Sequence, residues 1–160
     1  MLYNIRIVTS SGMLLIERTW SPIAEDGEKF SSMISELLTA LMVLSTKSVG
    51  MGMKYINMNA LGVSIASHAK TGIVCYVFHD EQDGEVFGGF LAESILNDFV
   101  TTNRLNADDG RRLGEFSLTQ DMSVFSAFQG VVLSSIKRTV NCILSEFRDR
   151  KGILYVDLIE

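Results

Sequence analysis

Residues 72–78, GIVCYVF, form a run in which every residue after the glycine is apolar or aromatic. Successive side chains of a strand point to opposite faces, so a strand of this composition is apolar on both faces. Such a strand lies at the centre of a sheet and is covered by helices on each side. The run therefore predicts a domain of three layers with the sheet in the middle.

Four more strands are expected around this central run. Residues 2–9 alternate in polarity, and the pattern resumes at residue 13 after a Ser-Ser-Gly corner that ends at Gly12, which predicts a β-hairpin. Two short runs bounded by turn residues precede the central strand. The predicted sheet is mainly antiparallel, and its five strands lie at residues 2–9, 13–20, 53–58, 61–67 and 72–79.

The apolar residues between and after the strands recur at three- and four-residue steps, which is typical of helices with one apolar stripe. Three helices are expected, at residues 27–46, 86–102 and 121–150, one on one face of the sheet and two on the other. The residues expected to face inward on the first helix are Phe30, Met33, Ile34, Leu37, Leu38, Leu41 and Met42. On the other two helices they are Phe90, Leu91, Ile95, Phe99, Phe125, Phe128, Val132, Ile136, Ile143 and Phe147.

Length and composition favour one compact domain over residues 1–150, since the chain has 160 residues of which 47% are hydrophobic. The net charge of -5 argues against a nucleic-acid partner. No apolar run is long enough to cross a bilayer, so we expect a cytoplasmic protein without direct membrane insertion, peripheral to membranes only through its partners. Cys75 and Cys142 have no metal-binding neighbours in sequence and are expected to stay reduced.

Motifs for catalysis or cofactor binding are not found in the sequence. Residues 85–90, EVFGGF, lack the lysine and spacing of a phosphate-binding loop and predict a helix start tightened for packing. His79, Asp80 and Glu81 alternate in direction on a strand, so they make a poor acid–base or metal cluster, and a solvated loop mouth is expected there. Residues 80–85, DEQDGE, lack the ligand spacing of a calcium loop. We therefore expect no enzyme activity, no cofactor and no metal.

The order of elements resembles that of the longin fold. The resemblance is carried by a hairpin at the first residues, YNIRIVTSSGMLLIER (3–18), by KYINM (54–58) leading to GIVCYVFHDEQD (72–83), and by FLAESILNDF (90–99). It covers residues 1–150 and implies an α/β (α+β) three-layer α-β-α domain. Roadblock-like domains share the central sheet but normally begin with a helix, so they rank second.

The outer face of the first helix suggests where function lies. Small, uncharged residues such as Ser35, Thr39 and Ala40 lie off its predicted apolar stripe, with Glu36 almost the only charge. A surface of this kind permits close approach by another backbone, although a serine-rich helix facing water has the same composition. Nearby methionines favour a contact surface, because methionine adapts to partners.

The last ten residues, 151–160, are expected to form an appended strand. Lys151 and Gly152 have the chemistry of a helix stop, and the seven residues that follow are almost all apolar. So short an apolar segment must be paired, and we expect the pairing to support a dimer. The predicted interface residues are therefore Ser35, Thr39, Val43, Met51, Met53, Tyr55, Ile153 and Tyr155.

Two hypotheses for function follow from these observations. The first is a non-enzymatic dimerisation and docking module, which the longin resemblance would place in a membrane-trafficking or small-GTPase regulatory complex. Its partners would be a second copy, another longin- or roadblock-like domain, or a small GTPase. The alternative is a small-molecule sensing domain of the PAS or profilin-like type, which requires a pocket of several hundred Å³ lined by convergent polar groups.

Overall fold

The fold contains one five-stranded sheet, seen in a computed structural model that describes residues 1–21, 27–108 and 125–151. The strands lie in the order β2-β1-β5-β4-β3, and every neighbouring pair is antiparallel. This confirms the predicted sheet and the central position of the strand predicted at residues 72–79, which begins at Val74 in the structure. The bounds are β1 Leu2–Val8, β2 Leu14–Thr19, β3 Tyr55–Met58, β4 Leu61–Ser67 and β5 Val74–Asp80.

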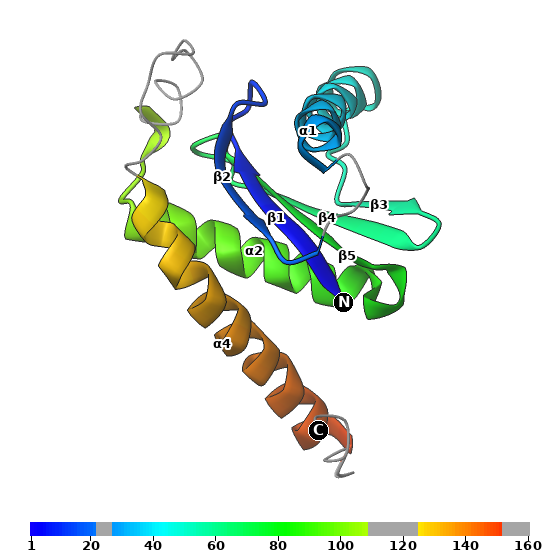
Figure 1. The fold of residues 1–160 in the computed structure, drawn as a ribbon, viewed down its shortest axis with the longest axis vertical. Helices are drawn as coiled ribbons and strands as arrows, with labels where there is room; N and C mark the ends of the chain where they lie inside the picture. Colours follow the sequence, from blue (N-terminus) through cyan, green and yellow to red (C-terminus); the bar gives the residue numbers. More distant parts are fainter. Residues whose placement is uncertain (22–26, 109–124, 152–160) are drawn as a thin grey trace.

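Helices cover both faces of the sheet, as predicted (Figure 1). Helix α1, Gly27–Leu44, lies on one face and continues into a π-helical turn, η1, at Ser45–Val49. Helices α2, Gly84–Thr102, and α4, Ser126–Lys151, lie on the other face. A short 3-10 turn, η2, at Glu81–Asp83 joins β5 to α2. The expected start of the last helix at residue 121 lies outside the described residues. Of the strand expected at 151–160, only Lys151 is described, and it is the last residue of α4.

The alternation along β5 divides the core into two clusters. Val74, Tyr76 and Phe78 face α1 and pack with Ile34 and Leu38. Cys75 and Val77 face the opposite way and pack under α2 and α4. The larger cluster on that side also contains Ile5, Ile7, Leu91, Ile95, Phe99, Phe128 and Val132.

A buried polar group interrupts the α1 face of the sheet near β1 and β2. The Arg6 guanidinium lies 5.4 Å from the centroid of the Phe78 ring and makes hydrogen bonds of 3.1 and 2.9 Å to one carboxylate oxygen of Glu17. Asn4 donates to the same oxygen at 2.9 Å. Burial lowers the pKa of Arg6, and the Glu17 carboxylate opposes this shift. Asn4 and Arg6 thus face away from Ile5 and Ile7, as the alternation of side chains along a strand requires.

The strand order and the two helix layers together form a longin-like arrangement: a hairpin, one helix on the first face, a three-stranded meander, and two helices on the second face. In the part of the chain that the structure describes, no helix is both long and apolar enough to cross a membrane.

The side-chain directions of two helices differ from prediction. On α1, Ile34 and Leu38 are buried as predicted, whereas Met33 and Leu37 are exposed. On α2, Leu91, Ile95 and Phe99 are buried as predicted, but Phe90 is exposed. In both helices the apolar arc is wider than the strip that the sheet can cover, so part of it remains in contact with solvent.

Candidate interaction surface

The outer side of α1 is an apolar surface, made of Met33, Leu37, Leu41, Val43 and Leu44, which we call the α1 surface. Met33 is 68% exposed, Leu37 57% and Leu44 60%. Large apolar side chains scattered singly are normal on a protein surface, but a contiguous group is typical of a contact site. Four of these residues, Met33, Leu37, Leu41 and Leu44, follow one another at three- and four-residue steps and therefore lie along one line of the helix.

This surface arises because α1 carries two apolar stripes side by side. Ile34, Leu38 and Met42 form the stripe that packs on the sheet. Met33, Leu37 and Leu41 each precede one of those residues, so their stripe is rotated by about 100° around the helix axis. Among the described residues, the first stripe packs on the sheet and the second is exposed.

The α1 surface continues past the end of the helix. Gly50, with φ of 73°, ends η1 and donates its amide to the Thr46 carbonyl oxygen at 3.1 Å. Such a left-handed conformation favours glycine. Ser45 holds the next turn of chain by donating to the Met51 carbonyl oxygen at 2.7 Å. Val49 and Met51 on either side of this glycine are exposed, which adds two apolar side chains to the same end of α1.

The predicted interface residues are distributed over several places in the structure. Val43 belongs to the α1 surface, and the exposed Met51 lies next to it, after η1. Met53 instead packs against the core under α1. Thr39 was expected on the outer face and this position is wrong: it is half-buried, its hydroxyl lies 3.4 Å from that of Tyr76, and it packs against Gly12. Tyr55 lies on the face of the sheet opposite α1, where its ring stacks on that of His79 with the two ring centroids 6.0 Å apart.

The remaining members of the predicted set are not placed. Ile153 and Tyr155 lie outside the described residues, and the side chain of Ser35 is not among those that the structure describes. The exposed Met33, Leu37 and Leu41 were missed because they were assigned to the core stripe of the helix. Their signal was the number of apolar residues on α1, which exceeds what one stripe on a sheet needs.

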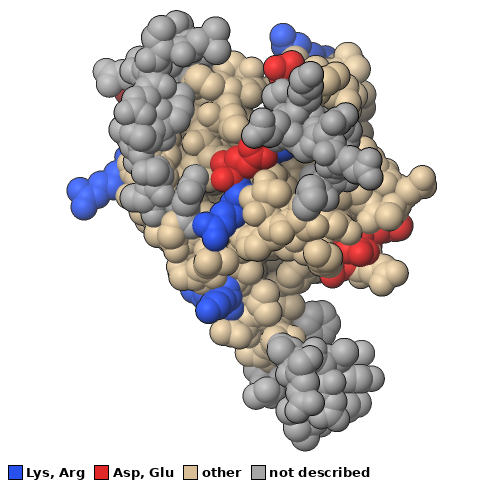
Figure 2. Space-filling view, viewed as in Figure 1, with Lys and Arg blue, Asp and Glu red and all other residues tan. Residues whose placement is uncertain are grey.

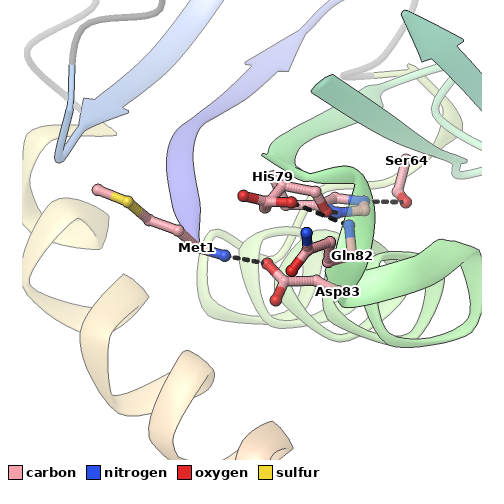
Figure 3. A network of polar contacts seen from close by, with 6 residues as sticks. Met1, Ser64, His79, Gln82 and Asp83 are labelled. Atoms are coloured by element: carbon pink, nitrogen blue, oxygen red, sulfur yellow. Dashed lines mark hydrogen bonds and ion pairs between the residues drawn. The ribbon is translucent and has the colours of Figure 1, made fainter. Parts of the chain in front are cut away.

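A second notable arrangement of side chains is a buried polar network between α2 and the sheet (Figure 3). The Ser64 hydroxyl lies 2.9 Å from His79 Nε2, and His79 Nδ1 lies 2.8 Å from the Asp80 carbonyl oxygen. Because a carbonyl only accepts, Nδ1 carries a proton, and in the neutral ring Nε2 accepts from Ser64. Beside this network, the amino group of Met1 forms an ion pair with Asp83 (Figure 3).

The expected solvated position of His79 is wrong, because the side chain is fully buried. Asp80 instead accepts from the Gln82 amide at 2.9 Å, and Glu81 accepts from Asn57 at 2.7 Å. The three residues thus point to different partners, as the strand alternation predicted. Within residues 1–21, 27–108 and 125–151, no three potential metal ligands lie together.

The two cysteines differ in access, which gives a direct chemical prediction. Cys75 is fully buried and burial raises the pKa of its thiol, whereas Cys142 is exposed on α4. Only a thiolate reacts readily with alkylating reagents. We expect iodoacetamide to label Cys142 alone in the folded protein and both residues after denaturation, as read by peptide mass spectrometry. Equal labelling of Cys75 in the native protein would contradict the packing of β5.

Comparisons with known proteins give weak structural similarities. Neither a protein-family model nor a curated protein matches this chain. The chain is similar to the gliding protein MglB from Thermus thermophilus, with a TM-score of 0.41 and 11% identity, over 71% of this chain and 78% of that chain. It is also similar to a homology model of the full-length AP-3 complex in a stretched open conformation, with a TM-score of 0.49 and 10% identity, over 96% of this chain and 100% of the matched chain. The longin-like arrangement itself rests on the strand order and helix layers described above.

Proposed function

We propose that this chain is a non-enzymatic interaction module that dimerises and docks through the α1 surface. The observation that carries the proposal is the exposed line Met33, Leu37, Leu41 and Leu44 on a helix whose other apolar stripe is already buried. The longin-like arrangement favours a place in a membrane-trafficking or small-GTPase regulatory complex. Such a place implies peripheral contact with membranes through partners, in the cytoplasm.

The chemistry of the α1 surface favours a second copy or a domain of the same fold as partner. Glu36 is the acidic residue beside this line, and Lys47 follows in η1, so the surface has little net charge. Two copies can therefore meet on it without like-charge repulsion. A two-fold axis would bring the same stripe of each copy together, as in most symmetric dimers. A small GTPase would be a further partner of the assembled module.

Glutamate substitutions in the stripe should weaken assembly. We expect Leu37→Glu and Leu41→Glu to raise the dissociation constant of the dimer at least about tenfold each, because a charge then enters the apolar centre of the contact. Sedimentation velocity over a concentration series measures this constant. Both side chains are exposed, so the thermal unfolding midpoint of each variant should stay close to that of the unmodified protein.

A matched control separates the α1 surface from general surface hydrophobicity. Leu133 on α4 is 41% exposed and lies away from α1, so Leu133→Glu should leave the dissociation constant unchanged. An unmodified chain that stays monomeric at high micromolar concentration would exclude the homodimer. An equal effect of the Leu133 and Leu37 changes would remove α1 from the proposal.

A further inference from the structure

A groove separate from the α1 surface lies between α2 and the edge of the sheet at β3 and β4. It has a volume of about 270 Å³, and its lining residues are Lys54, Ile65, Glu85, Val86, Gly89, Phe90 and Glu93. Five of these come from one side of α2, in its first half. The Lys54 carbonyl oxygen accepts from the Ile65 amide at 2.8 Å, which fixes the sheet wall.

The helix wall of this groove is apolar in the middle and acidic at both ends. Val86 is 71% exposed and Phe90 54%, and they lie one helical turn apart. Gly89 lies between them, and a side-chain carbon there would meet nothing within 4 Å, so the space above it is open. Glu85 and Glu93 stand before and after this apolar pair and are both exposed. The helix wall thus presents an apolar surface, formed by Val86 and Phe90, with a carboxylate at each end.

The two carboxylates of the groove, those of Glu85 and Glu93, are exposed. Among the described residues, neither Glu85 nor Glu93 forms an ion pair within 4 Å, unlike Asp83, which pairs with the amino group of Met1. Burial raises the pKa of the nearby Tyr55, and the carboxylates of Glu81 and Glu85 raise it further. Glu81 and Glu85 thus place negative charge at this end of the groove, and Lys54 places one positive charge on the sheet wall. Figure 2 shows acidic side chains on the right of that view, where η2 and the start of α2 lie in Figure 1.

We propose that this groove binds a short extended peptide segment of a partner protein, with a large apolar side chain between two basic ones. Glu85 and Glu93 are eight residues apart on α2, which corresponds to about 12 Å along the helix axis. An extended peptide covers about 13 Å in four residues, and its residues i, i+2 and i+4 share one face. A basic residue at i and at i+4 can therefore reach the two carboxylates while the apolar residue at i+2 enters the space over Gly89. Lys54 on the sheet wall then faces the carbonyl oxygens of the peptide.

The test uses the full chain and designed peptides in a ¹H–¹⁵N NMR titration. The probe is the peptide GKTLTKG, and the matched controls are GETLTEG, with reversed charge, and GKTSTKG, without the apolar residue. We expect saturable shifts of amides in the first half of α2 and at Lys54 with the first peptide. Loss of two exposed ion pairs corresponds to about a two- to thirtyfold change in Kd, and like charges add repulsion, so the charge-reversed peptide should bind more weakly by at least that factor.

Variants of the groove make the assignment specific. The double change Glu85→Lys and Glu93→Lys should reverse the preference, so that GETLTEG binds more tightly than GKTLTKG. Phe90→Ser should weaken binding of both peptides, and the fold should persist because Phe90 is exposed. Leu37→Glu, on the other face of the sheet, should change neither, so this result is independent of whether α1 mediates assembly.

Three outcomes would overturn the proposal. The first is the lack of saturable shifts in α2 with GKTLTKG. The second is a charge preference that does not follow the residues at positions 85 and 93. The third is a change of oligomeric state caused by Phe90→Ser alone, which would assign the groove to a second copy of the chain.

Discussion

Alanine at position 88 will destabilise the protein by about 2–3 kcal/mol, whereas alanine at the neighbouring position 89 will stabilise it by about 0.5–1 kcal/mol. A Cβ added to Gly88 would lie 2.2 Å from both His79 Nε2 and Ser64 Oγ. The His79 ring is held in place, because its Nδ1 donates a hydrogen bond to the Asp80 carbonyl oxygen. Helix α2 must then move away from the sheet, which opens the core below it.

Gly89 gives the matched control on the same helix. The space around it is open, so alanine there meets no clash and adds only its higher helix propensity. Urea unfolding of the two variants, followed by far-ultraviolet circular dichroism, gives both free energies of unfolding on one scale. Equal changes at the two positions would mean that α2 does not approach Ser64 and His79 as closely as described.

The second large effect is expected for His79→Ala, at about 3 kcal/mol of destabilisation. The change leaves a cavity where a fully buried ring stood, and it removes the partner of the buried Ser64 hydroxyl. It also removes the stacking surface of Tyr55. The other histidine serves as control: His68 is half-buried in a turn and contacts the Thr71 hydroxyl at 2.9 Å, so His68→Ala should cost about 1 kcal/mol or less.

A double-mutant cycle isolates the Ser64–His79 hydrogen bond. If the bond contributes as described, Ser64→Ala will cost less in the His79→Ala background than in the unmodified protein, since the hydroxyl is then already without this partner. Chemical denaturation of the four proteins provides the values. Strict additivity of the two single changes would show that the two side chains act independently and would contradict the network.

The sheet and its layers were predictable because alternation and turn residues directly encode strand faces. The run from residue 72 to residue 78 placed β5 at the centre, and the hairpin at Gly12 is confirmed, with φ of 87° at that residue. EVFGGF was interpreted as a helix start tightened for packing, which holds for Gly88, where a Cβ would meet His79 and Ser64, but not for Gly89, where the space is open. In each case the local chemistry had one structural solution.

The candidate surfaces were predicted less well, because they depend on which part of an apolar arc meets the sheet. Leu37 and Leu41 fit a core stripe as well as Ile34 and Leu38 do, and periodicity alone does not rank the two stripes. For the same reason Phe90 on α2 was predicted to face inward, although it is exposed. His79 was assigned to a solvated loop mouth because its alternation with Asp80 and Glu81 ruled out a cluster, although its own side chain is buried between the sheet and α2. These directions are set by the docking of helices on the sheet, which is a tertiary property.

The position of β5 between β1 and β4 also sets the order of events during synthesis of the chain. Pairing of Val8 with Val74 closes a loop formed by residues 9–73. The strands β1 and β2 are therefore synthesised well before β5, the strand that pairs with β1. At ~5–20 residues per second on the ribosome, synthesis of residues 9–73 takes on the order of 3–13 s. During this time β1 and β2 form at most a two-stranded hairpin, which is barely stable in water. Because this long-range closure is entropically costly, β5 joins the two halves late. Until then the apolar face of the hairpin lacks α2 and α4, the helices that cover it in the folded domain.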